Sequence, residues 1–209
     1  MNIRNKISRL FLIAIGAMAL ATKPAQAHSF NAVLVLPLSG GAAEARQYRQ
    51  GFIIATAERD SHPDQESDGH LGGLDAYVQV ADGEAGDLDK RLATGGKTGK
   101  PDIVAVLGPE ATLERVRALL GGTKPVLQPP GRTPFDNPGQ PGVARFTAAY
   151  QKAYGQPPSA AAAQGYNAAR RIATAVRAQG GVDDPRRCAG ISRQPPAVLL
   201  GEEKLNARV

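Results

Sequence analysis

The stretch that decides the fold is residues 31–60, NAVLVLPLSGGAAEARQYRQGFIIATAERD. It begins with a nearly continuous apolar run over residues 32–36, as expected of a parallel strand that is covered on both faces. Residues 37–41, PLSGG, interrupt the run, and apolar residues then recur at helical spacing. A strand, a glycine-containing turn and a helix form the first half of a βαβ unit. Such a unit brings the start of the helix to the carboxyl end of the sheet, where open α/β folds bind ligands.

The first 27 residues have the three regions of a secretory signal peptide. Three basic residues, Arg4, Lys6 and Arg9, precede an apolar segment over residues 10–21 that is too short to span a bilayer comfortably. Residues 25–27, AQA, form an A-x-A cleavage site. We therefore predict cleavage after residue 27 and release to the periplasm, with a retained membrane anchor as the alternative.

Length, net charge and cysteine content limit what the mature chain can be. Removal of 27 residues from 209 leaves 182, which suffices for one well-buried α/β domain and is short for two. The leader holds four of the cations and none of the acids, so the net charge of +6 falls to about +2 (6 − 4) and indicates no nucleic-acid partner. The single cysteine, Cys188, excludes an internal disulfide.

Apolar periodicity along the rest of the chain predicts the fold class. Strands are expected near residues 32–37, 74–80, 103–107 and 125–128, and helices at 42–59, 86–95, 111–121, 143–154 and 159–179. This order, βαβαβαβ followed by two helices, predicts a doubly wound parallel α/β sheet. Residues 182–209 are weakly patterned, and residues 197–200 could form a last strand.

The sequence contains no recognised motif for a metal site, a cofactor site or a catalytic site. His62 and His70 lie in a polar stretch over residues 61–73 beside three acids, without zinc-site spacing, so solvated loop residues are favoured over a metal site. GGKTGK at residues 95–100 follows a helix and precedes a strand, the reverse of a phosphate-binding loop. No GxSxG elbow and no GxGxxG after a strand occur. We expect neither an enzyme nor a bound cofactor.

Four segments resemble the substrate-binding proteins of branched-chain amino-acid ABC transporters, the Leu/Ile/Val-binding family. They are VLVLPLSGGAAEARQYRQGFIIATAE at 33–58, VAVLGPEAT at 104–112, KPVLQPPGRTPF at 124–135 and RFTAAYQKAYGQPPSAAAAQGYNAARRIATAVRAQGG at 145–181. The last, with its F-x-x-x-Y-x-x-x-Y-G-x-x-P and GY-x-A-A pattern, is the most specific. Together they cover most of residues 32–181 in family order.

The resemblance implies a type I periplasmic-binding fold with one lobe in place of two. Family members cross to a second lobe after the Pro-rich segment, whereas here only ten residues separate Phe135 from Phe146. The expected organisation is a signal peptide (1–27), a single substrate-binding-protein-like lobe (28–181) and a weakly patterned tail (182–209). A frameshifted or decayed end is the alternative for the tail.

The resemblance also implies that ligand contacts come from three loops at the carboxyl ends of the strands. The corresponding candidates are Ser39, Gly40, Glu110, Ala111, Gly131 and Arg132. A Ser hydroxyl and helix-start amides can hold a carboxylate, but Ser39 could equally be an N-cap. Glu110 would repel a carboxylate or simply favour the helix start, and Arg132 could bind an anion or be a solvated loop residue.

Three further residues are considered for the site. Ala45 stands where an aromatic residue often covers the ligand in the family. Tyr166 is predicted to be a core residue. Asp82, at the end of the second strand, is in the right place for the rim of a cleft, but a turn with Gly83 is favoured.

The leading hypothesis is an exported solute-binding protein of an ABC-type importer, or its remnant. It would hold a small solute, such as an amino acid or a related molecule, for a permease in the inner membrane. The alternative is a periplasmic interaction or sensor module without tight solute capture, for which a homodimer that restores two lobes is one form.

Overall fold

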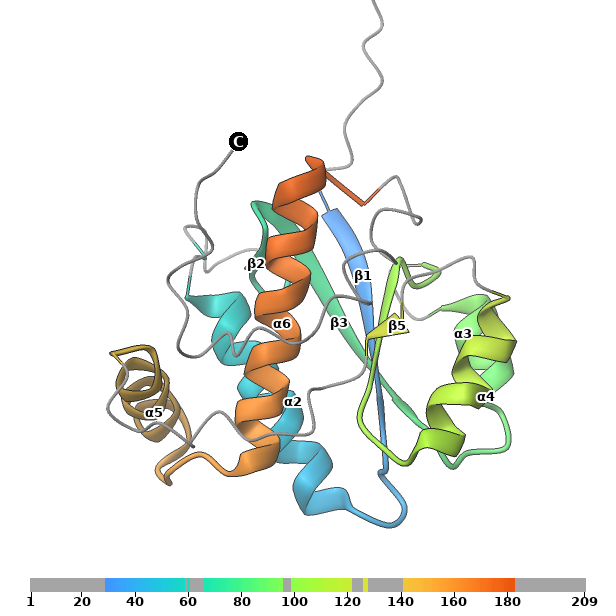
Figure 1. Ribbon diagram of the computed structural model, residues 1–209, viewed down its shortest axis with the longest axis horizontal. Helices are drawn as coiled ribbons and strands as arrows, with labels where there is room; N and C mark the ends of the chain where they lie inside the picture. The colour runs from blue at the N-terminus through green and yellow to red at the C-terminus, as the bar shows by residue number, and fades with distance from the viewer. Residues whose placement is uncertain are drawn as a thin grey trace, which may run out of the picture.

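The computed structural model describes residues 29–58, 60, 66–95, 99–121, 126–127 and 141–182 (Figure 1). In chain order the elements are β1 (Ser29–Leu36), α2 (Ala42–Ala57), β2 (His70–Leu71), β3 (Leu74–Asp82), α3 (Leu88–Thr94), β4 (Ile103–Val106), α4 (Glu110–Leu120), β5 (Val126–Leu127), α5 (Pro141–Tyr154) and α6 (Ala160–Gln179). The predicted signal peptide, His62, Gly131, Arg132, Cys188 and the candidate strand at 197–200 lie outside the described residues.

The sheet has the order β2-β3-β1-β4-β5, with β1 at its centre. Strand β1 pairs in parallel with β3 on one side and with β4 on the other, and β4 pairs in parallel with β5. The chain therefore leaves β1 toward β3 and then passes back to β4. Right-handed connections that run in opposite directions place their helices on opposite faces. The predicted fold class, a doubly wound parallel α/β sheet, is confirmed.

Two hydrophobic cores flank the sheet, and β1 contributes to both. Phe30, Ala32, Leu34 and Leu36 belong to the core under α2, α5 and α6. The intervening Val33 and Val35 belong to the core under α3 and α4. This two-sided burial is the reason that the strand reads as an uninterrupted apolar run.

Helices α2 and α6 lie side by side and cross at glycine (Figure 1). A Cβ atom added at Gly51 would lie 1.8 Å from the carbonyl oxygen of Ala162, and one added at Gly165 would lie 1.9 Å from that of Tyr48. Only glycine lets the two backbones approach this closely. Nearby, Tyr166 is buried, as predicted for a core residue, and its hydroxyl donates to the Glu58 carboxylate at 2.6 Å.

Strand β2 was not predicted, and it makes the sheet mixed. It pairs antiparallel with β3 through a two-residue turn at Gly72 and Gly73, whose φ angles are +68° and +96°. Two consecutive positive φ values are the signature of a tight hairpin, and glycine adopts them without strain. The Gly-Gly pair was thus the signal that the sequence analysis overlooked.

The expectation that His70 is a solvated loop residue is wrong. His70 lies in β2 with 16% of its side chain exposed. Its Nδ1 lies 3.1 Å from Asp60 Oδ1, and its Nε2 lies 2.8 Å from Asp75 Oδ1. The side chain therefore joins the end of α2 to the edge of the sheet.

The ends of the helices agree with the predictions to within two residues. Ser159 caps α6, because its Oγ accepts from the backbone N–H of Ala162 at 3.2 Å, as its position before the helix predicted. None of the helices in the described ranges is long and apolar enough to cross a membrane.

Candidate functional site

The loops that follow β1, β3 and β4 gather at the carboxyl edge of the sheet, at the bottom of Figure 1. Parallel register brings them together: Leu36 at the end of β1 pairs with Asp82 at the end of β3, and Val35 pairs with Val106 at the end of β4. The backbone N–H of Gly83 also donates to the carbonyl of Leu36 at 2.9 Å. The candidate site residues were predicted to lie at this edge.

Asp82 links the β1–α2 loop to the β3–α3 loop. Its Oδ2 accepts from the hydroxyl of Ser39 at 2.5 Å, and its Oδ1 accepts from the backbone N–H groups of Leu38 at 3.3 Å and Glu84 at 3.1 Å. The hydrogen bond from Ser39, and after it the one from Glu84, holds the pKa of Asp82 below its usual value. The bond from Glu84 agrees with the predicted turn at Asp82 and Gly83, whereas the bonds to the other loop were not predicted.

Ser39 is not the N-cap of α2. That position belongs to Gly41, and no side chain caps the helix. The Ser39 hydroxyl is instead directed to Asp82. Its neighbour Gly40 lies beside a second carboxylate, because a Cβ added there would be 3.4 Å from Glu84 Oε1.

Glu110 and Ala111 open α4, directly after Pro109. The Glu110 carboxylate lies in the first turn, where it interacts favourably with the helix dipole, and 3.7 Å from the Arg117 guanidinium. The side chain is 64% exposed, so this pair is worth little to stability.

Arg115 fastens α4 to the β3–α3 loop, a role that the sequence analysis did not consider. Its guanidinium donates to the carbonyl of Ala85 at 3.1 Å and, at 3.4 Å, to that of Gly83. A Cβ added at Gly83 would lie 2.9 Å from Thr112 Cγ2, so the first turn of α4 packs directly on this loop. The structure thus brings the loops of Ser39, Gly40 and Glu110 together through Asp82 and Arg115. Gly131 and Arg132 lie outside the described residues.

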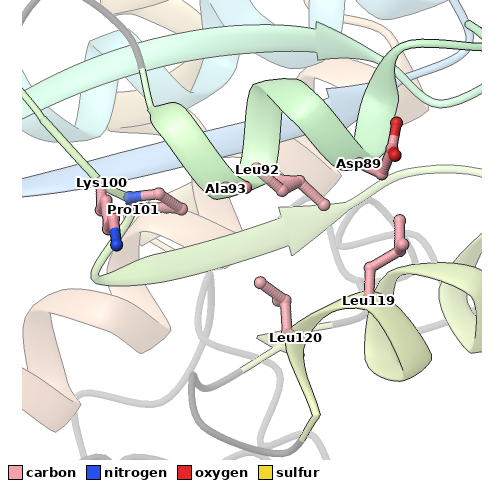
Figure 2. Close-up of a pocket in the computed structure, with 7 residues that line it drawn as sticks. All are labelled: Asp89, Leu92, Ala93, Lys100, Pro101, Leu119 and Leu120. Carbon is pink, nitrogen blue, oxygen red and sulfur yellow. The ribbon is translucent and has the colours of Figure 1, made fainter.

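A separate hollow of about 290 Å³ lies between α3 and α4 (Figure 2). Leucine, alanine and proline side chains line it, and Asp89 and Lys100 lie at its ends. Because Lys100 and Pro101 precede β4, the hollow is at the amino end of the sheet and away from the predicted site. Within the ranges described above, no three or more His, Cys, Asp or Glu side chains are grouped so that they could hold a metal ion.

Fold and edge together define the class as a doubly wound α/β lobe with its loops gathered at the carboxyl ends of the strands. No family model matches the chain, and no curated protein matches it. Among solved structures, the chain is similar in fold to the leucine-binding protein LivK from Thermotoga maritima. The sequence identity is 15%, the match covers 78% of this chain and 87% of that chain, and the TM-score is 0.48.

Proposed function

We propose that this chain is an exported solute-binding lobe of the kind that serves ABC-type importers, resembling branched-chain amino-acid binding proteins. The main support is the convergence of three strand-end loops at the carboxyl edge of the sheet, the usual ligand position in open α/β folds. Asp82 and Arg115 hold these loops in place before any solute arrives. Preorganised loops lose less conformational freedom on binding, which favours a recognition role.

In this proposal the lobe works in the periplasm and presents its solute to an inner-membrane permease. A single lobe covers one side of a small solute and leaves the other side in water. Only part of the apolar surface of an amino acid is then buried, at roughly 25 cal/mol per Å². The lobe therefore acts as a weak, rapidly exchanging binder, or as the remnant of a tighter one.

Export can be tested by expressing the whole chain in a bacterium and measuring the intact mass of the protein in the periplasmic fraction. We expect a mass that lacks residues 1–27. The control is Ala27→Asp, which removes the small residue of the A-x-A site and should leave the leader attached. A native protein that retains the leader would contradict the proposal.

Binding can be tested by recording amide NMR spectra of the exported protein while a panel of amino acids is added. We expect shifts at Leu38, Ser39 and Glu84, the amides of the linked loops. The resonances of Leu119, at the far end of the sheet, serve as the internal reference. Shifts confined to other regions, or none even at solute concentrations far above about 1 mM, would contradict a solute site at this edge.

The alternative, an interaction or sensor module, is favoured by one observation. Leu38 is 38% exposed at the carboxyl edge, beside Ser39, and is one of two large apolar side chains exposed in the described part of the chain. A partner lobe or a second copy could cover it. Light scattering on the exported protein tests this: a dimer that Leu38→Ser disrupts would support the alternative. Leu119→Ser, at the other exposed leucine (42%), is the matched control.

A further inference from the structure

The hydrogen of the Ser39 hydroxyl is committed to a hydrogen bond with Asp82. Its partner Asp82 has a lowered pKa and is therefore ionised near neutral pH, and an ionised carboxylate can only accept hydrogen bonds. The hydrogen in the 2.5 Å contact must then come from Ser39. What the hydroxyl can offer to a solute is its lone pairs, because its single hydrogen is already used.

Two neighbouring backbone donors are committed as well. The N–H of Leu38 donates to Asp82 Oδ1 at 3.3 Å and to the carbonyl of Leu36 at 3.0 Å, and the N–H of Gly41 donates to the carbonyl of Pro37 at 2.9 Å. The groups beside Gly40 are acceptors, since the Glu84 carboxylate lies next to it. The polar side-chain groups that the two linked loops present here, the Ser39 hydroxyl and the Asp82 and Glu84 carboxylates, are therefore available to accept hydrogen bonds.

We infer that Ser39 accepts a hydrogen bond from the solute, so that this loop binds the ammonium or N–H end of the solute, and that Asp82 is the positioning residue that sets this polarity. The inference rests on the proposed solute site and adds the chemical group that the site selects. It reverses the expectation, drawn from residue type, that Ser39 donates to a carboxylate. A carboxylate at this position would meet the lone pairs of Ser39 and the charge of Glu84, both unfavourable.

The geometry of Asp82 suggests a substitution that would reverse the polarity and keep the loops joined. Its Oδ1 accepts from the backbone N–H groups of Leu38 and Glu84, and its Oδ2 accepts from the Ser39 hydroxyl. In Asp82→Asn, the amide oxygen can keep the two backbone contacts while the amide nitrogen takes the place of Oδ2. That nitrogen donates to Ser39 Oγ, and the hydroxyl hydrogen is then free to point toward a solute.

The experiment uses two probes, each of which lacks one of the two charged groups of leucine. Isopentylammonium is leucine without its carboxylate, and isocaproate is leucine without its amino group. Each is added near pH 7 to the exported protein, and the shifts of the Leu38, Ser39 and Glu84 amides yield a dissociation constant. We expect the native protein to prefer the ammonium probe, and Asp82→Asn to reduce that preference by at least about fivefold, because a charge-assisted hydrogen bond is replaced by a mismatch.

A matched control separates polarity from net charge. Asp87→Asn removes one negative charge from the same loop–helix segment, but Asp87 pairs with Arg91 and does not touch Ser39. Its effect on the preference should be small. A native preference for isocaproate would overturn the inference, as would Asp82→Asn and Asp87→Asn changing the preference equally. Leucine binding with shifts away from this loop would also overturn it, yet would leave the export and solute-binding roles standing.

Discussion

Replacing Gly51 by alanine should force α2 and α6 apart where they cross. The added Cβ would lie 1.8 Å from the Ala162 carbonyl oxygen, whereas ordinary contact begins at 3.4 Å, so 1.6 Å is missing (3.4 − 1.8). The obstacle is backbone in the middle of a helix and cannot rotate away as a side chain could. Either the helices separate or the methyl group bends both backbones.

The magnitude follows from two opposing terms. Overpacking of this kind costs about 3 kcal/mol, the upper part of the usual range, because Tyr48, Phe52 and Tyr166 are buried at the same interface. Alanine returns about 1 kcal/mol through its better helix propensity. The net loss is about 2 kcal/mol in the free energy of unfolding, which corresponds to roughly 4–8 °C in Tm for a chain of this size.

Urea unfolding followed by circular dichroism measures the loss, with Gly86→Ala as the matched control. Gly86 has no atom within 4 Å of its ideal Cβ position, and its φ is not positive. Its substitution should therefore change the free energy of unfolding by less than about 0.5 kcal/mol. If Gly51→Ala proved as stable as Gly86→Ala, the close crossing of α2 and α6 would be refuted.

Three other predictions concern the site and the core. Because the pKa of Asp82 is lowered in the folded state, its stabilising contribution is complete above the ordinary carboxyl pKa of about 4 and is lost as the pH falls through the lower folded value. The urea midpoints of the native chain and of Asp82→Asn should therefore converge as the pH falls below about 4. A difference that stays constant with pH would contradict this. Tyr166→Phe removes the hydrogen bond to Glu58 and should lower the free energy of unfolding by about 1 kcal/mol in the same assay, whereas an unchanged midpoint would show that the bond contributes nothing. Calorimetry on the exported protein should give a dissociation constant for leucine no tighter than about 1 mM, or about −4 kcal/mol, and micromolar affinity would mean that another surface covers the solute.

Local patterns predicted most of the fold. The apolar run of β1 and the stripes of α2 and α6 are periodic over many residues, and periodicity reports directly which faces are buried. Strand β2 was not predicted, because a strand of two residues is too short to show an alternation of apolar and polar side chains. His70 was misassigned for the same reason, since its partners Asp60 and Asp75 lie on other segments and only the hairpin at Gly72 and Gly73 brings them to it.

The loops that meet at the carboxyl edge could be predicted from the sequence, but the hydrogen bonds that join them could not. The sequence indicated which loops meet, because parallel strands end at one edge of the sheet. It could not show that Asp82 would take the hydrogen of Ser39, since the two are 43 positions apart and are joined only by the pairing of β1 with β3. Residue type alone therefore suggested a donor to a carboxylate, whereas in the structure the hydroxyl already donates to Asp82.

The contact between Asp82 and Ser39 depends on the register of the pairing between β1 and β3. Leu36 lies opposite Asp82 in the β1–β3 pairing, so the carboxylate stands at the end of its strand as the neighbouring chain turns into PLSGG. A slip of one residue would send each side chain of β3 to the opposite face of the sheet and would expose Ala76 and Val78 in place of their polar neighbours. Burial of those residues thus holds the register, and the register brings Asp82 to Ser39. The hydrogen bonds at this edge therefore depend on the apolar core beneath it as much as on the polar residues at its surface.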